Sequence, residues 1–190
     1  MKPVAAYTVL MSIMLLGCSS QKKNEEGQPP TLSSQSQNVA GVQWSIPANW
    51  TKGPEKQMRV GTYLVKGSDD NAEQGECAVF YFGEGQGGNV EANIDRWFAQ
   101  FENRTNEERK KEEFNGIKVT TVSVQGNYLS PGGPMMESQG TKEKHSLCGA
   151  IVEAPGGMVF FKFTGPTPLV DGASKDFRAM LQSLSKSVAG

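Results

Sequence analysis

The sequence is poor in the residues that most catalytic and transition-metal sites require. Its 190 residues include one histidine, His145, and three cysteines. Catalytic triads and most transition-metal sites use a histidine whose partners orient it. His145 follows Lys144 in a polar stretch, so we expect it to be solvated. Neither Gly-x-Ser-x-Gly nor His-Glu-x-x-His occurs, and the sequence therefore predicts no catalytic residues and no enzyme.

The sequence also lacks a surplus of charge. Nineteen Lys and Arg residues stand against 20 Asp and Glu residues, for a formal net charge of −1. No stretch forms a basic patch of the kind that holds a phosphate backbone. The charge balance therefore argues against nucleic acid as a partner.

Two stretches contain residues of the kinds that bind metals. Met135, Met136 and His145 share one segment, and thioether with imidazole suits copper, but adjacent methionines more often pack or make contacts. An EF-hand loop counted from Asp69 would need glycine and glutamate where Gln74 and Phe80 stand. We therefore predict no metal and no cofactor.

Long hydrophobic runs are absent as well. Val4 to Leu16 is mostly apolar, follows Lys2, and is too short to cross a membrane as a helix. It is typical of a secretory signal peptide. It ends in Leu15-Leu16-Gly17-Cys18, which resembles the lipobox of bacterial lipoproteins, although Leu16 is a less usual residue at its place. An ordinary signal peptide with a chance cysteine is the alternative.

The lipobox resemblance implies that residues 1–17 are removed and that Cys18 carries lipid. Three acyl chains exceed the two signals that stable anchoring needs. Ser19 stands where an inner-membrane lipoprotein tends to have aspartate, which in a two-membrane bacterium resembles the outer-membrane default. Residues 18–40 contain no aromatic residue and include Pro29-Pro30. They cannot offset the entropy of ordering, so we expect a flexible tether.

Residues 41–190 are enough for one domain with a sizeable core. Cys77 to Phe82 is apolar at every position, which predicts a central strand covered on both faces. A glycine loop from Gly83 to Gly88 follows, and Asn89 can cap a helix that continues to Phe101. The apolar stripe of this helix has a helical period and consists of Val90, Ile94, Trp97, Phe98 and Phe101.

The remaining segments predict mainly antiparallel strands. Asn115-Gly116 suits a type I′ hairpin turn, and Pro155-Gly156-Gly157 a second tight turn. Residues 104–111 are charged and predict a connector, and Ser174 can cap a last helix. The expected order is β-β-β-α-ββ-ββ-α. This order predicts an α+β domain, with a single antiparallel sheet of about six to seven strands and helices packed on it.

With these elements placed, residues 41–188 resemble the PsbP-like fold. The resemblance implies an αβα sandwich of the kind found in many bacterial envelope lipoproteins. It also implies a role in binding proteins or assisting assemblies, with no shared catalytic residues. The residues that carry the resemblance are Trp44-x-x-Pro47-x-x-Trp50, Ala78 to Phe82, Asn89 to Phe101, Gly149 to Gly165, and Phe177 to Leu184.

Cys77 and Cys148 both lie in apolar segments expected to be core strands. Export to an oxidising compartment allows a disulfide. A bridge between them would close a loop of about 70 residues and contribute about 4 kcal/mol. It requires Cα atoms within about 7 Å. The alternative is two independent buried cysteines.

Two loops are candidates for a binding surface. The first contains Gly85 and Gly87, and the second runs from Ser130 to His145 and carries Met135 and Met136. Loops of this length are often functional, although the methionines can instead fold back over a sheet edge. We expect a non-enzymatic, membrane-anchored envelope lipoprotein that binds a protein or an envelope component. The alternative is a small-molecule binding or hydrolytic domain with these two loops as pocket walls.

The lipid anchor is tested by Cys18→Ala. Without its thiol the chain cannot receive the thioether-linked lipid, so we expect an uncleaved or soluble protein without acyl chains. Intact-mass analysis of the wild-type and variant proteins measures this. A wild-type N-terminus at another residue, with no acyl mass, would contradict the prediction.

Overall fold

The computed structural model describes residues 29–67, 73–130 and 140–187. The predicted signal peptide, Cys18, Met135 and Met136 lie outside these ranges. Within the described residues, no helix is both long and apolar enough to cross a membrane. These ranges form two sheets and two helices.

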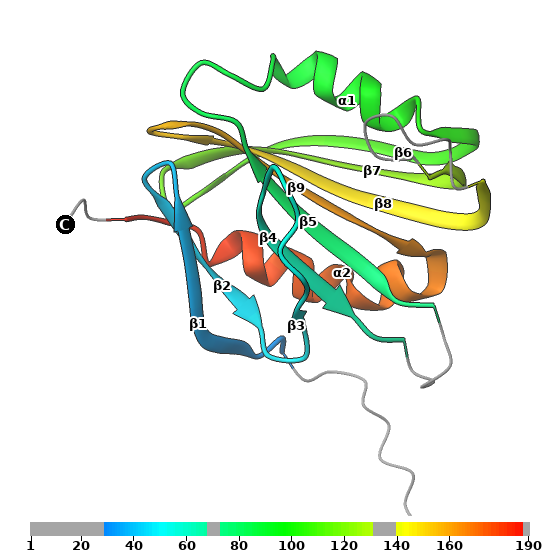
Figure 1. Cartoon of the computed structure of the whole chain (residues 1–190), viewed down its shortest axis with the longest axis horizontal. Helices are drawn as coiled ribbons and strands as arrows, with labels where there is room; N and C mark the ends of the chain where they lie inside the picture. Colours follow the sequence, from blue (N-terminus) through cyan, green and yellow to red (C-terminus); the bar gives the residue numbers. More distant parts are fainter. Residues whose placement is uncertain (1–28, 68–72, 131–139, 188–190) are drawn as a thin grey trace, which may run out of the picture.

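The largest element is a seven-stranded sheet in which every neighbouring pair is antiparallel (Figure 1). The long β6 to β9 strands form two hairpins, as the turn residues predicted. Asn115 and Gly116 have φ angles of 51° and 76°, which suits the predicted type I′ turn. In spatial order the strands are β3 (Thr51–Lys52), β4 (Arg59–Val65), β5 (Gly75–Tyr81), β9 (Gly157–Pro166), β8 (Thr141–Ala154), β7 (Ile117–Leu129) and β6 (Phe101–Phe114).

A second sheet makes the single-sheet prediction wrong. It has three strands: β1 (Leu32–Val39), β2 (Val42–Pro47) and β10 (Ser185–Lys186). The predicted tether, residues 18–40, is therefore wrong over β1. No side chain of β1 is fully buried, so polar residues are tolerated there. Backbone pairing with β2 orders the strand, and composition does not reveal such pairing.

The two helices cover opposite faces of the large sheet (Figure 1). The first, α1 (Val90–Phe98), begins where predicted, because Asn89 Oδ1 accepts a hydrogen bond from the Ala92 amide at 2.8 Å. It ends earlier than predicted, and Phe101 opens β6. The second, α2 (Thr167–Gln182), begins before the predicted cap Ser174. Pro168 lies in its first turn, where a missing N–H is tolerated.

The charged segment 104–111 is part of β6 and not a connector. β6 is the edge strand of the large sheet and pairs only with β7 among the described residues. Nearly all of its side chains between Phe101 and Phe114 are exposed. Charged side chains are favourable on an exposed edge, where they discourage pairing with other chains. Their lack of alternation is why the sequence did not predict a strand.

The two faces of the large sheet carry separate cores. On one face, α2 and β2 pack against the sheet, and Trp44 meets Phe161 edge-on at 5.0 Å between ring centroids. Trp44 Nε1 also donates to the Tyr63 hydroxyl at 3.2 Å. On the other face, α1 packs over β6, β7, β8 and Phe160 of β9. The outer face of β4, β5 and the rest of β9 has no helix over it (Figure 1).

Of the two alternatives for Cys77 and Cys148, the structure favours two independent cysteines over a disulfide, because both are free thiols. Cys77 of β5 and Cys148 of β8 both lie opposite Phe163 of β9. Strands two places apart are separated by roughly 9 to 10 Å, beyond the reach of a disulfide. Burial raises the pKa of the Cys148 thiol to about 11, and that of Cys77 well above its usual value. Both therefore behave as small apolar residues.

Thiol counting tests this arrangement. The Cys18→Ala protein, unfolded without reductant, is expected to react with two equivalents of maleimide. The native protein should react far more slowly, because thiolate is the reactive form and both thiols are held protonated. Mass spectrometry of the labelled protein gives the count. An unreactive unfolded protein that gains two labels after reduction would contradict the predicted free thiols.

Candidate functional site

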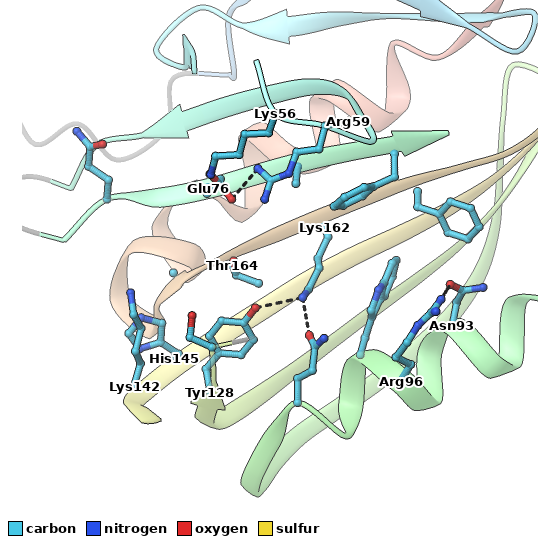
Figure 2. Close-up of a pocket in the computed structure, with 18 of the residues that line it drawn as sticks. Lys56, Arg59, Glu76, Asn93, Arg96, Tyr128, Lys142, His145, Lys162 and Thr164 are labelled. Carbon is cyan, nitrogen blue, oxygen red and sulfur yellow. Dashed lines mark hydrogen bonds and ion pairs between the residues drawn. The ribbon is translucent and has the colours of Figure 1, made fainter. Parts of the chain in front are cut away.

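The uncovered half of the α1 face forms a cleft with a volume of about 570 Å³. Strands β5 and β9 form its floor, α1 forms one wall, and the chain entering β4 forms the other (Figure 2). We call this site the Lys162 cleft, after the residue at its centre. Its charged lining consists of Lys56, Arg59, Arg96, Lys142, Lys162, Glu73 and Glu76.

Strand alternation produces the floor of the cleft. On β9, Phe161 and Phe163 point to the α2 core, and the residues between and beside them point to the α1 side. Phe160 lies under α1, whereas Lys162 and Thr164 reach the part of the sheet that α1 does not cover. The neighbouring strand β5 adds Glu76, Ala78 and Phe80 to the same face.

Lys162 is partly buried and makes only neutral contacts. Its Nζ donates to Gln100 Oε1 at 2.5 Å and to the Tyr128 hydroxyl at 3.2 Å. It also lies 5.2 Å from the centroid of the Tyr128 ring. Among the described residues, no carboxylate is within ion-pair distance of Lys162. Burial, reinforced by the charge of Arg59, lowers the pKa of Lys162 to about 8.

The wall opposite α1 is an ion-pair cluster around Glu76. Lys56 and Arg59 contact the Glu76 carboxylate at 2.6 and 2.8 Å. Burial disfavours the charged carboxylate, but the hydrogen bond from Lys56 and the charge of Arg59 outweigh it and hold the pKa of Glu76 below its usual value. Arg59 also lies 5.5 Å from the centroid of the Phe80 ring. The cluster fixes Arg59 at the edge of the cleft.

One end of the cleft is closed by Glu73, Lys142 and His145. Lys142 donates to Glu73 at 2.5 Å, and this hydrogen bond lowers the pKa of Glu73. His145 is only 5% exposed, so the prediction of a solvated histidine is wrong. It belongs to β8, which begins at Thr141, and its ring stacks on that of Tyr128.

The two ring nitrogens of His145 have different surroundings. Nδ1 lies 2.8 Å from the Glu143 carbonyl, an acceptor, so Nδ1 carries the proton in this contact. Nε2 is buried and makes no hydrogen bond within the described residues. The nearest carboxylate oxygen, on Glu73, is 3.5 Å away.

On the α1 wall, Asn93 is a buried polar residue that organises its surroundings. Its Nδ2 donates to the carbonyls of Gly87 and Asn89, each at 2.8 Å. Its Oδ1 accepts a hydrogen bond from Arg96. Asn93 therefore ties the glycine loop to α1 and positions a second cation that has no carboxylate partner among the described residues.

The cleft carries a surplus of positive charge in a chain with a net charge of −1. Five cations and two carboxylates line it, which gives a difference of three positive charges with His145 neutral. Lys56 and Arg59 share the Glu76 carboxylate and Lys142 pairs with Glu73, whereas Lys162 and Arg96 have no carboxylate partner among the described residues. In the described residues, no group of three metal-binding side chains forms a metal site. The chemistry suits an anion.

The structure brings only part of the predicted site together. Gly87 lines a smaller hollow of about 460 Å³ that shares Phe82, Asn93 and Arg96 with the Lys162 cleft. Gly85 has no contact at its Cβ position and lines neither hollow. From the segment that begins at Ser130, the cleft uses Ser130 itself, Lys142 and His145. Met135 and Met136 lie outside the described residues.

Sequence analysis missed the central residue of the site. Lys162 is the one charged residue in Val159-Phe160-Phe161-Lys162-Phe163, which is otherwise apolar on both faces. A charge in a strand covered on both sides is unusual, and this was the available signal. Asn93 and Arg96 gave none, because polar residues are ordinary on the outer side of a helix.

Comparisons with known proteins place the chain near three solved structures. No family model and no curated protein matches the sequence. A Pseudomonas aeruginosa protein of unknown function aligns with a TM-score of 0.47 and 11% identity, over 85% of this chain and 100% of that one. The cyanobacterial PsbP protein, CyanoP, of Synechocystis aligns at 0.48 and 11%, over 86% and 96%.

The third structure, from Bacteroides thetaiotaomicron, aligns with a TM-score of 0.38 and 10% identity, over 79% of this chain and 46% of that one. Likenesses of this size do not say what a chain binds. The function is therefore argued from the Lys162 cleft alone.

The lowered pKa of Lys162 leads to a stability prediction. In the unfolded chain a lysine has a pKa of about 10.4. Burial therefore destabilises the charged form fully below pH 8, and this cost disappears as the pH rises from about 8 to 10.4. We expect Lys162→Met to melt at or above the wild-type temperature at pH 7 and to lose this advantage by pH 10.

Thermal unfolding followed by circular dichroism at several pH values measures the effect. Lys110→Met is the matched control, because Lys110 lies on the exposed edge strand β6. A Lys162→Met protein that is much less stable than wild type at pH 7 would show that the lysine is needed for folding.

Proposed function

We propose that this protein is a non-enzymatic, lipid-anchored binding protein of the cell envelope, and that it holds a small anionic ligand in the Lys162 cleft. One observation carries the proposal. The ammonium group of Lys162 lies partly buried at the centre of a cavity, with hydrogen bonds only to neutral groups among the described residues. A bound anion would supply the negative charge that no described residue places beside this ammonium group.

The cost of this arrangement supports a role in binding. Removing an ammonium group from water is unfavourable unless an opposite charge is near. The neutral contacts with Gln100 and Tyr128 compensate only in part, as the lowered pKa shows. A unit negative charge at 4 Å gains about 4 kcal/mol at the effective dielectric constant typical near a protein surface. A bound anion can therefore offset the desolvation cost that the Lys162 ammonium group carries in the folded protein.

The cavity favours a small molecule over a protein partner. Small-molecule sites are concave and contain a few convergent polar groups, whereas protein-binding surfaces expose contiguous apolar area. The Lys162 cleft is concave and lined by several polar side chains, as small-molecule sites are. Within the described residues, the exposed large apolar side chains are Met58 and Phe82, which do not form a broad patch. These features support the small-molecule binding part of the alternative in the sequence analysis. We do not extend the proposal to hydrolysis.

The proposal also includes a lipid anchor at Cys18. The resemblance of residues 15–18 to a lipobox supports lipidation at Cys18, and the PsbP-like resemblance fits an envelope lipoprotein. Since β1 begins at Leu32, the segment from Cys18 to β1 is shorter than the predicted tether. A lipid anchor at Cys18 would hold the cleft close to the membrane surface.

Ligand binding is tested with small anions at constant ionic strength. Isothermal titration calorimetry with acetate, benzoate and phosphate is performed on wild-type protein, on Lys162→Met and on Lys110→Met as the control. We expect at least one anion to bind wild type and Lys110→Met alike, and Lys162→Met to bind it at least tenfold more weakly. Such a loss corresponds to about 1.4 kcal/mol.

Folding of each variant is checked by its unfolding temperature, so that a loss of binding is not confused with a loss of structure. Equal anion affinity in wild type and folded Lys162→Met would contradict the proposal. So would the absence of binding of every anion by wild type at millimolar concentration.

A further inference from the structure

A row of aromatic rings leads from the floor of the Lys162 cleft to its mouth. Phe80 and Phe82 are nearly parallel, with ring centroids 6.1 Å apart and an angle of 14° between planes. Phe82 is also 5.8 Å from Phe160. Phe82 is 37% exposed, and it lines both the cleft and the adjoining hollow. A large aromatic side chain thus faces solvent at the entrance to a charged cavity.

The glycine loop holds the Phe82 ring in place. A Cβ atom on Gly87, which has a φ angle of +90°, would lie 2.8 Å from the Phe160 ring and 3.0 Å from the Phe82 ring. Only glycine can therefore bring the backbone this close to both rings. The Gly87 carbonyl is in turn fixed by Asn93. Phe82 is part of a packed arrangement and not a loosely attached surface residue.

Two guanidinium groups lie beside the aromatic row. Arg59 lies 5.5 Å from the centroid of the Phe80 ring and is fixed by Glu76. Arg96 lines both hollows with Phe82 and is held by Asn93. Guanidinium groups stack well on flat π-systems. A ligand placed on Phe82 therefore meets an aromatic face and planar cations together, with Lys162 deeper in the same cavity.

We propose that the ligand is a flat aromatic acid, with its ring on Phe82 and its acid group directed to Lys162. This inference rests on the proposed function and names the class of ligand. The acid is a carboxylate, sulfonate or phosphate on one or two fused rings. The cavity volume of about 570 Å³ falls within the range of small-molecule sites.

Flatness distinguishes this class from other organic acids. A saturated acid of the same size presents the same charge and a similar apolar area, but it has no π-face for Phe82 or for the guanidinium groups. Aromatic stacking adds roughly 2- to 10-fold in affinity beyond the burial of area. A long aliphatic acid would need an enclosed apolar channel, whereas many polar side chains line this cleft.

The test compares four probes by titration calorimetry with the full-length protein. They are 2-naphthoate, decahydronaphthalene-2-carboxylate, acetate and 2-naphthalenemethanol, which separate ring flatness, ring area and charge. We expect 2-naphthoate to bind wild type about fivefold or more tightly than the saturated ring acid. The neutral alcohol should bind at least tenfold more weakly than 2-naphthoate.

Variants locate the effect within the site. Phe82→Leu keeps apolar area but removes the flat ring, so it should abolish the preference for 2-naphthoate while the saturated acid still binds. Phe114→Leu is the matched control, because Phe114 also lies near an arginine, with Arg178 at 5.7 Å from its ring centroid, outside the cleft. The control should keep the preference.

A second measurement does not depend on the variants. In NMR spectra of the wild-type protein, 2-naphthoate should shift the ring resonances of Phe82 through its ring current, and the saturated acid should shift them little. Larger shifts at Phe114 than at Phe82 would place the ligand elsewhere and overturn the inference.

The outcomes separate this inference from the proposed function. Equal affinity for the two ring acids, with both lost in Lys162→Met, would overturn the aromatic ligand and leave the anion site standing. Binding of the alcohol as tight as that of 2-naphthoate, or no Lys162-dependent binding of any acid, would overturn both.

Discussion

The two faces of the large sheet are covered to different extents, and the rest of the structure depends on this difference. On one face α2, with its 16 residues, and the strand β2 cover the central strands. On the other face α1 packs over β6, β7, β8 and Phe160 of β9. On β9, Phe161 and Phe163 point toward the α2 core, whereas Lys162 and Thr164 point into the cleft. The cleft lies where this face of the sheet has no helix over it.

The position of Lys162 at the edge of the area that α1 covers explains its electrostatic properties. Lys162 is close enough to the core of α1 to lose part of its hydration, and its pKa falls to about 8. It is also far enough into the opening to be reached from solvent, since it lines the cavity with Arg59 and Arg96. An apolar residue at this position would avoid the desolvation cost. The partly buried charge of Lys162 is therefore the main support for our proposal that this face binds a ligand.

Local signals in the sequence predicted the elements well, and pairing between distant segments decided what they could not. Asn89 and Asn115-Gly116 specified a helix start and a turn through backbone chemistry, and both are confirmed. The β1 strand and the charged half of β6 were missed, because their order comes from partner strands. The sequence left open whether Cys77 and Cys148 form a disulfide, because only the sheet order shows that β9 lies between their strands. Lys162 was visible as one charge among phenylalanines, but Asn93 and Arg96 join it only through the fold.

The most direct test of the anion site is the pKa of Lys162, measured by NMR titration of its ammonium group with and without a bound carboxylate. The account predicts a pKa of about 8 in the free protein and a clear rise when the carboxylate binds, because a nearby negative charge favours the protonated amine. A pKa near the ordinary lysine value of about 10.4, unchanged by carboxylates, would contradict it.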